Sequence, residues 1–123
     1  MTFTDVLPED WSYSYIKTLY NAKIINGKTE NVFGKSENLT RADLAVILKR
    51  ISGIINIESK ENNGEEFADD SEIPEYAKDA VYEMKALGVI NGMGDNSYNP
   101  NGLVTRAQAS KAVYFLMTLM KGA

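Results

Sequence analysis

The feature that most constrains this chain is an internal repeat. Phe3-Thr4-Asp5 returns as Phe67-Ala68-Asp69, and Thr40-Arg41-Ala42 returns as Thr105-Arg106-Ala107. The second copy follows the first by about 65 residues and keeps one register, apart from a single inserted residue near its start. A register held over so long a stretch indicates two copies of one structural unit, so the chain is expected to fold as two similar halves.

Each copy is predicted to contain two helices joined by a loop. In the first helix of each copy, apolar and aromatic residues recur at helical spacing along one face. In copy one, residues 8–10 suit the start of this helix; in copy two, Pro74 suits its first turn and Gly88 its end, where copy one has Lys23. The predicted stripes are Trp11, Tyr15, Ile16, Leu19 and Tyr20 in copy one and Tyr76, Ala80, Val81, Met84 and Leu87 in copy two.

The second helix of each copy is predicted to begin at a threonine. Thr105 and Gln108 have the spacing of a capping box, in which the threonine oxygen accepts a hydrogen bond and the glutamine side chain reaches back. Thr40 and Asp43 form a weaker version, because aspartate is shorter than glutamine. Both helices are apolar around much of their circumference, which favours positions in the middle of an all-α bundle rather than on its surface.

The loops between the helices span 26–39 and 91–104 and are rich in glycine, asparagine and serine, which tolerate tight turns. Phe33 and Tyr98 are predicted to pin these loops to the core. The polar segment between the copies is interpreted as an exposed connector, with a turn at Asn62-Asn63-Gly64. The predicted division is repeat one at 1–55, the connector at 56–66 and repeat two at 67–123.

Composition excludes several kinds of chemistry. The chain has no cysteine and no histidine, so it lacks thiolate metal sites, cysteine nucleophiles and the commonest general base. Its net charge of −4 disfavours generic electrostatic binding to nucleic acid or to an anionic surface. No apolar run has the length of a membrane span. We therefore predict a non-enzymatic protein without cofactor or metal, in which any anionic ligand needs a local cationic pocket.

The order of these motifs resembles that of the S-layer homology family. The shared elements are Phe-x-Asp, an aromatic residue that opens helix one, Ile-Asn-Gly, an aromatic loop residue, and Thr-Arg-Ala followed by an acid or amide. They correspond here to Phe3, Asp5, Trp11, Gly27, Phe33 and Thr40 to Asp43, and to Phe67, Asp69, Tyr76, Gly92, Tyr98 and Thr105 to Gln108. The resemblance covers nearly the whole chain.

The resemblance implies a non-covalent anchor on the bacterial cell wall or surface layer, outside the cell. Members of this family usually carry three repeats whose long helices meet at a pseudo-threefold core. Secondary cell-wall polysaccharide, often pyruvylated, binds in grooves between the repeats. This chain departs from the pattern in having two copies, and in having Tyr76 where tryptophan is usual. Loss of a first repeat by truncation explains the first departure and makes the expected fold a partial pseudo-trimer.

Arg41 and Arg106 are the strongest candidates for ligand binding. Each is expected in the first turn of a helix, where the helix dipole disfavours a cation. A guanidinium beside helix N-terminal N–H groups forms a compact site for a carboxylate, such as that of a pyruvate ketal on a sugar. The alternative is that each arginine pairs with Asp5 or Asp69. These two acids are also expected either to bind sugar hydroxyls or to cap the first helix.

Two further pairs of residues complete the predicted site. Trp11 and Tyr76 are expected either to stack on a sugar ring or to be buried as anchors of the first helix. Gly27 and Gly92 are expected to allow an unusual backbone angle, with close approach of the ligand as a secondary reading. The predicted ligand-binding set is Arg41, Arg106, Trp11, Tyr76, Asp5, Asp69, Gly27 and Gly92.

Two other classes of function stay open at this point. Two apolar central helices do not close a three-helix core alone, so an exposed face is expected to seek a partner, either a missing third repeat or a second copy in a homo-oligomer. An enzyme such as a glycoside hydrolase needs a positioned pair of carboxylates. The chain has many acids but no catalytic motif, which makes this alternative the least favoured.

Overall fold

The computed structural model describes residues 1–57, 64, 66–92 and 94–121, so most of the predicted connector, including Asn62-Asn63 of the predicted turn, lies outside the described residues. The elements in chain order are α1 (Tyr13–Asn21), β1 (Asn38–Thr40), α2 (Arg41–Ile54), the 3₁₀ turn η1 (Asp70–Glu72), α3 (Glu75–Ala86), β2 (Leu103–Thr105) and α4 (Arg106–Lys121). The predicted helix–loop–helix order of each copy is confirmed. The two short strands are an addition that the hydrophobic pattern does not predict.

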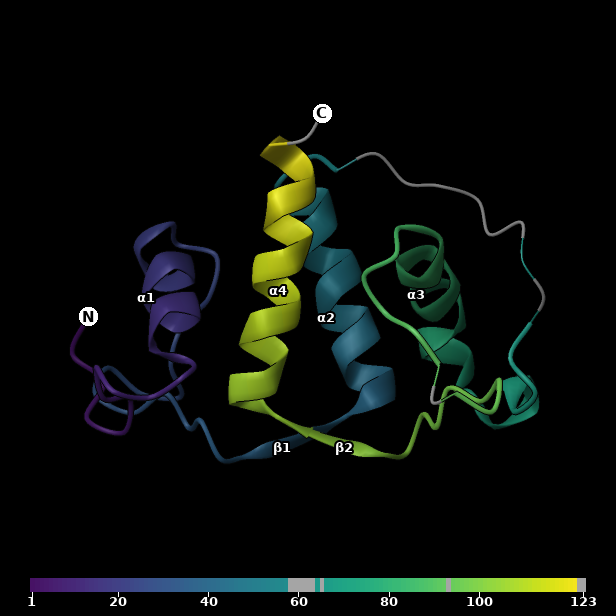
Figure 1. Ribbon diagram of the computed structural model, residues 1–123, viewed down its shortest axis with the longest axis horizontal. Coiled ribbons are helices and arrows are strands. Elements are labelled where there is room, and N and C mark those ends of the chain that lie inside the picture. The colour runs from purple at the N-terminus through teal and green to yellow at the C-terminus, as the bar shows by residue number, and fades with distance from the viewer. Residues whose placement is uncertain (58–63, 65, 93, 122–123) are drawn as a thin grey trace.

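The long helices α2 and α4 lie side by side in the centre of the molecule, and α1 and α3 flank them on opposite sides (Figure 1). The prediction that the most apolar helices occupy the middle of a bundle is confirmed, because Ala45, Leu48 and Leu116 are completely buried. In the part of the chain that the structure describes, none of the helices is both long and apolar enough to traverse a lipid bilayer.

Within the chain, the helices of the two copies pack across the repeat boundary. α1 packs against α4, which belongs to the other copy, and α3 packs against α2. Tyr15 of α1 meets Tyr114 of α4 edge to face, with ring centroids 5.1 Å apart. Each first helix therefore packs on the second helix of the other copy, and neither copy buries its apolar face by itself. The predicted repeat boundaries stay a prediction.

The strands β1 and β2 pair antiparallel at the foot of the central helices, with Leu39 opposite Val104 (Figure 1). Each strand leads directly into a central helix, so the pairing brings the starts of α2 and α4 to the same end of the molecule. The first N–H of α2 donates to the carbonyl oxygen of Gly102, and the first N–H of α4 donates to that of Glu37, both at 2.8 Å. Each helix start is therefore completed by backbone from the other copy.

The predicted helix caps are confirmed. The hydroxyl oxygen of Thr105 accepts from the N–H of Gln108 at 3.1 Å, and the side-chain oxygen of Gln108 accepts from the N–H of Thr105 at 2.8 Å. In copy one, the hydroxyl oxygen of Thr40 accepts from the N–H of Asp43 at 3.0 Å. Only copy two forms the reciprocal bond, as the shorter side chain of aspartate leads one to expect.

Both first helices end in a left-handed residue. Gly88 has a φ of 76°, as the sequence predicts for a glycine just after the end of α3. Lys23 takes the same conformation after α1, with a φ of 63°, although its Cβ makes that conformation unfavourable. The repeated fold thus imposes the same turn on both copies, whichever residue occupies it.

Each loop is pinned by its aromatic residue. Phe33 and Tyr98 are 3% and 0% exposed, which confirms the predicted role. Phe33 packs on Phe3, and Tyr98 packs on Phe67, with ring centroids 5.5 Å apart in each case. The Phe-x-Asp motif of each copy therefore packs under the loop of the same copy and fixes its position.

Candidate functional site

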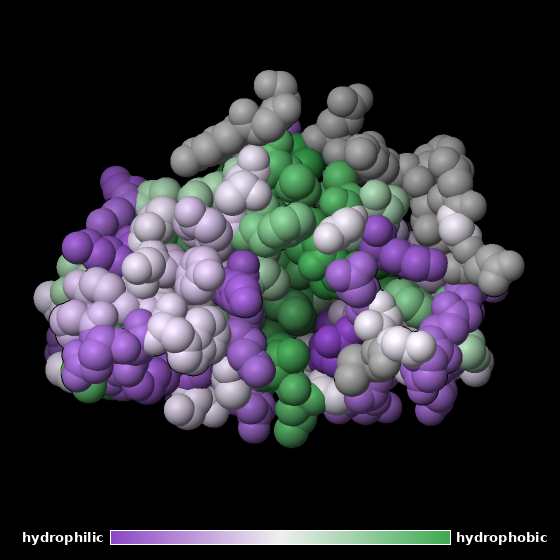
Figure 2. Space-filling model, in the orientation of Figure 1, coloured by the Kyte–Doolittle hydropathy of each residue, from purple (hydrophilic) through white to green (hydrophobic). Residues whose placement is uncertain are grey.

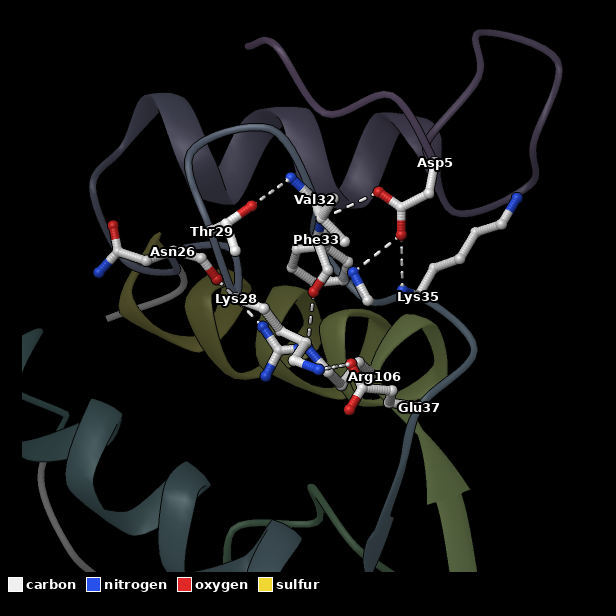
Figure 3. Close-up of polar contacts among 10 residues, drawn as sticks. Asp5, Asn26, Lys28, Thr29, Val32, Phe33, Lys35, Glu37 and Arg106 are labelled. Carbon is white, nitrogen blue, oxygen red and sulfur yellow. Dashed lines mark hydrogen bonds and ion pairs between the residues drawn. The ribbon is translucent and has the colours of Figure 1, made fainter.

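Arg106 reaches from the start of α4 into the loop of copy one (Figure 3). Its Nε donates to the carbonyl oxygen of Phe33 at 2.9 Å, and its Nη2 donates to the carbonyl oxygen of Asn26 at 3.1 Å. The guanidinium carbon lies 4.7 Å from the centre of the Phe33 ring. Arg106 therefore fastens the loop of one copy to the central helix of the other.

Arg41 makes the corresponding contacts in the opposite direction. Its Nε donates to the carbonyl oxygen of Tyr98 at 2.8 Å, and its Nη2 donates to that of Asn91 at 3.0 Å. The guanidinium lies 4.6 Å from the centre of the Tyr98 ring. The hydroxyl of Tyr98 donates in return to the carbonyl oxygen of Arg41 at 2.6 Å, and burial raises the pKa of this phenol to about 12.

Neither arginine pairs with a carboxylate. Among the described residues, each of the ion pairs is made by a lysine, so the alternative in which Asp5 or Asp69 neutralises an arginine is wrong. The physical reason is that the bonds of each guanidinium to two carbonyl oxygens and its stacking on a ring hold it without a counter-charge. Direct contact of either arginine with a ligand stays a prediction.

The N–H groups at the starts of α2 and α4 are already used. The N–H of Ala42 donates to the carbonyl oxygen of Pro100 at 3.0 Å, and the N–H of Ala107 donates to that of Lys35 at 3.1 Å. The preceding N–H of each helix is bonded to the opposite loop, and the following one to the threonine cap. These donors do not form the open anion cradle that the sequence suggests.

Asp5 and Asp69 brace the loops through backbone N–H groups, and α1 begins without a side-chain cap. Burial opposes ionisation of Asp5, but three N–H donors at 2.8 to 3.1 Å outweigh it and hold the pKa of this carboxyl below its ordinary value. Contact of Asp5 or Asp69 with sugar hydroxyls stays a prediction. The donors are those of Phe33, Gly34 and Lys35 for Asp5 (Figure 3) and of Tyr98 and Asn99 for Asp69.

Gly27 and Gly92 are required for space rather than for backbone angle. Neither has a positive φ, so the predicted reason for these glycines is wrong. A Cβ on Gly27 would lie 2.7 Å from the carbonyl oxygens of Thr29 and Val32, and a Cβ on Gly92 would lie 2.8 Å from that of Ser97. Each glycine lets its loop fold closely over itself, and approach of a ligand to either backbone stays a prediction.

Trp11 and Tyr76 lie on the surface. Trp11 is 59% exposed and stands just before α1, whereas Tyr76 is 66% exposed in the first turn of α3. The alternative in which these aromatic residues are buried anchors is therefore wrong. Their surroundings differ, because the hydroxyl of Tyr76 donates to a carboxylate oxygen of Asp43 at 2.7 Å.

Trp11 borders a cleft of about 490 Å³ between the two copies, which we call the Trp11 cleft. One wall is formed by the segment before α1 and by the loop of copy one. The other wall is formed by the start of α4, from copy two. The lining residues are Glu9, Asp10, Trp11, Ser12, Lys35, Ser36, Thr105, Ala107 and Gln108.

Lys35 supplies the positive charge of this cleft, and the sequence analysis missed it. Its Nζ lies 2.8 Å from a carboxylate oxygen of Asp10, and the two side chains are 32% and 20% exposed. The N–H of Leu7 and the ammonium of Lys35 hold the pKa of Asp10 below its ordinary value. Because copy two has Pro100 at the equivalent position, Lys35 belongs to no repeated motif, and only its spatial position reveals it.

The remaining groups of the Trp11 cleft are suited to a polar, ring-shaped ligand. The side-chain oxygen of Gln108 is used by the helix cap, whereas its amide nitrogen has no partner within the described part of the chain. An ammonium such as that of Lys35 has three donor hydrogens, so its bond to Asp10 leaves others available. The cleft thus offers an aromatic face, two kinds of donor and the carboxylate of Glu9 as an acceptor.

Comparison with known proteins identifies the same repeat. A model of the S-layer homology domain matches residues 2–45 and 66–110. The exoglucanase XynX of Acetivibrio thermocellus is 34% identical over 94% of this chain, and the amylopullulanase of Thermoanaerobacterium thermosulfurigenes is 33% identical over 94%. The S-layer protein EA1 of Bacillus anthracis is 29% identical over 86% of the chain. The chain spans only 11%, 6% and 12% of these relatives, respectively.

Proposed function

The chain belongs to the S-layer homology domain family, and on that premise we propose that it anchors its protein to the bacterial cell wall by binding secondary cell-wall polysaccharide in the Trp11 cleft. The role is non-enzymatic and is exerted outside the cell, at the wall or surface layer. The matched relatives include S-layer proteins and a cell surface protein, which supports this location. The observation that carries the proposal is an exposed tryptophan beside a lysine in a cleft between the two copies.

The proposed contacts follow from the chemistry of the lining. The exposed ring of Trp11 offers a flat apolar face on which a sugar ring can stack. The ammonium of Lys35 attracts a sugar carboxylate, such as that of a pyruvate ketal, and the amide of Gln108 donates to a ring substituent. An acidic sugar is therefore the proposed ligand, although the carboxylate of Asp10 partly offsets the charge of Lys35.

Arg41 and Arg106 enter this proposal mainly as positioning residues. Arg106 fixes the loop that carries Lys35 against the helix that carries Gln108, so it sets the width of the Trp11 cleft. The sequence also predicts that a wider set contacts the ligand, namely both arginines, Tyr76, both aspartates and both glycines. The proposal does not depend on these further contacts. Substitution of Trp11 or Lys35 tests the cleft directly, because the side chain of Trp11 makes no hydrogen bond among the described residues and that of Lys35 pairs with Asp10 on the same wall.

Sedimentation with purified cell-wall sacculi tests the proposed function. The wild-type protein is expected to co-sediment, and Trp11→Ala is expected to remain mainly in the supernatant. Phe115→Ala is the matched control, since Phe115 is also an exposed aromatic residue, 46% accessible, but lies on α4 outside the lining of the cleft. Equal binding to walls stripped of their secondary polysaccharide contradicts the proposal.

Self-assembly is a second candidate function, and exposed apolar surface favours it. Figure 2 shows a hydrophobic band along the central helices between the two more hydrophilic flanks. Ile54, Leu103 and Phe115 are 67%, 64% and 46% exposed. Contiguous apolar surface of this kind is often an interface. Light scattering over a dilution series tests this candidate, and a monomer at every concentration contradicts it.

A further inference from the structure

We propose that the chain has one functional glycan site rather than two: the Trp11 cleft receives the ligand, and its counterpart in the other half is bridged by a hydrogen bond and electrostatically unsuitable. This inference rests on the proposed function and specifies its stoichiometry. The counterpart, which we call the Tyr76 position, is defined by the residues equivalent to the cleft lining, chiefly Tyr76, Asp43, Glu75 and Pro100.

A hydrogen bond ties the two walls of the Tyr76 position together. The hydroxyl of Tyr76, at the start of α3, donates to a carboxylate oxygen of Asp43, at the start of α2, at 2.7 Å. These two elements correspond to the two walls of the Trp11 cleft, where Trp11 and Gln108 occupy the equivalent places. The indole of Trp11 has no hydrogen-bond partner within the described residues, so no side-chain bond like that of Tyr76 crosses the open cleft. The backbone bond from Ala107 to Lys35 does join its walls, but the other half has the same bond, from Ala42 to Pro100.

The charges of the two positions differ in the direction that matters for an acidic ligand. Where the Trp11 cleft has Lys35, the Tyr76 position has Pro100, so the ammonium is missing. Where the cleft has the amide of Gln108, the Tyr76 position has the carboxylate of Asp43, which only accepts hydrogen bonds when ionised. A sugar carboxylate placed there would meet a like charge, and the residues equivalent to the cleft lining supply no cation to offset it.

The tyrosine is also held more firmly than its exposure suggests. The hydroxyl of Tyr76 donates to the carboxylate of Asp43 at 2.7 Å, and this bond raises the pKa of the phenol, so the neutral, donating form is favoured. A ligand that displaced the Tyr76 ring would break this bond to a carboxylate. Trp11 lines the cleft and has no such bond to break.

Titration with a defined fragment of secondary cell-wall polysaccharide, long enough to fill one cleft, tests the proposal. Calorimetry is expected to give one equivalent per chain. Trp11 is the only tryptophan, so its fluorescence reports the open cleft alone and is expected to saturate at the same equivalent. Two calorimetric equivalents, or further heat after the fluorescence has saturated, overturn the proposal while leaving the proposed function intact. Absence of any binding by the wild type defeats both.

Variants at equivalent places distinguish the two positions further. Trp11→Ala and Lys35→Gln are each expected to weaken binding at least tenfold, whereas Tyr76→Ala is expected to change it less than twofold. Gln108→Glu introduces a carboxylate, as Asp43 does in the other half, but keeps a side chain suited to the capping box, so it is expected to fold and to bind at least fivefold more weakly. Circular dichroism verifies folding. Equal weakening by Trp11→Ala and Tyr76→Ala contradicts the single-site proposal.

Discussion

Replacing Arg106 with alanine separates the structural role of the arginines from a direct role in binding. The substitution removes two hydrogen bonds from a charged donor to the carbonyl oxygens of Phe33 and Asn26, together with the stacking on the Phe33 ring. Hydrogen bonds to charged groups contribute about 1.5–3 kcal/mol each, and a partly exposed cation–π contact adds about 0.5–1 kcal/mol. Because Arg106 is half-buried, we take the low end of each range and expect a loss of about 3.5 kcal/mol.

Urea unfolding followed by circular dichroism measures this loss as a change in the free energy of unfolding. Arg41→Ala is expected to cost a similar amount, because its two donor distances and its ring distance nearly equal those of Arg106. Arg106→Lys is expected to retain about half of the stabilisation, since an ammonium reaches one carbonyl but has no planar fork. Arg50→Ala is the control: Arg50 is exposed on α2, and its loss is expected to change the free energy by less than about 0.5 kcal/mol.

A specific pair of results would refute this reasoning. If Arg106→Ala unfolds with nearly the wild-type free energy and yet no longer binds cell walls, the arginine contacts the ligand and does not hold the loop. If the variant is destabilised as expected, weaker binding is a consequence of the displaced cleft wall. Binding measured at a temperature where the variant remains folded distinguishes the two cases.

Three further substitutions have expected outcomes. Gly88→Ala is expected to lower the free energy of unfolding by about 1 kcal/mol, measured by thermal denaturation, because the left-handed φ alone penalises the new Cβ, which meets no neighbour. The pKa of Asp5 is lowered in the folded state, so its contribution to stability is present above pH 3.8, the ordinary pKa of the group, and is lost as the pH falls through the lower folded-state pKa. Asp5→Asn is expected to reduce the decrease in the free energy of unfolding at acid pH. The pKa of Tyr98 is raised from 10.0 to about 12, so its contribution to the free energy of unfolding is fully present below pH 10 and is lost as the pH rises to about 12. In an ultraviolet titration, Tyr98→Phe is expected to show one late-ionising phenol fewer than the wild type, and an unchanged curve contradicts the assignment.

The helices and their caps were predictable because their signals are local. The bonds between Thr105 and Gln108 join residues three apart, and the geometry of a helix start determines that they meet. The pinning of the loops by Phe33 and Tyr98 followed from apolar residues in otherwise polar segments. The repeat also directed attention to Arg41 and Arg106, since the same uncommon placement occurs twice.

The reasons for several predicted residues could not be obtained in this way. Gly27 and Gly92 were expected for their backbone angle, but the structure assigns them to close packing against carbonyl oxygens, which depends on how the loop folds back. Lys35 was not predicted because it is not repeated: the repeated motifs contain only residues that the two copies have in common. The Trp11 cleft depends on residues that differ between the copies, such as Lys35 and its counterpart Pro100.

The sequence by itself determined that this chain is helical, because periodicity and capping act over a few residues. The order of its motifs, present twice, matches the S-layer homology family. Only the tertiary structure decided that the helices pack across the repeat boundary, that the arginines bind carbonyl groups of the opposite loop, and that a cleft opens at Trp11 while Tyr76 is bonded across its own position. Arg106 and Asn26 are 80 residues apart in the chain. Which distant groups meet is set by the packing of whole helices, and no local pattern encodes it.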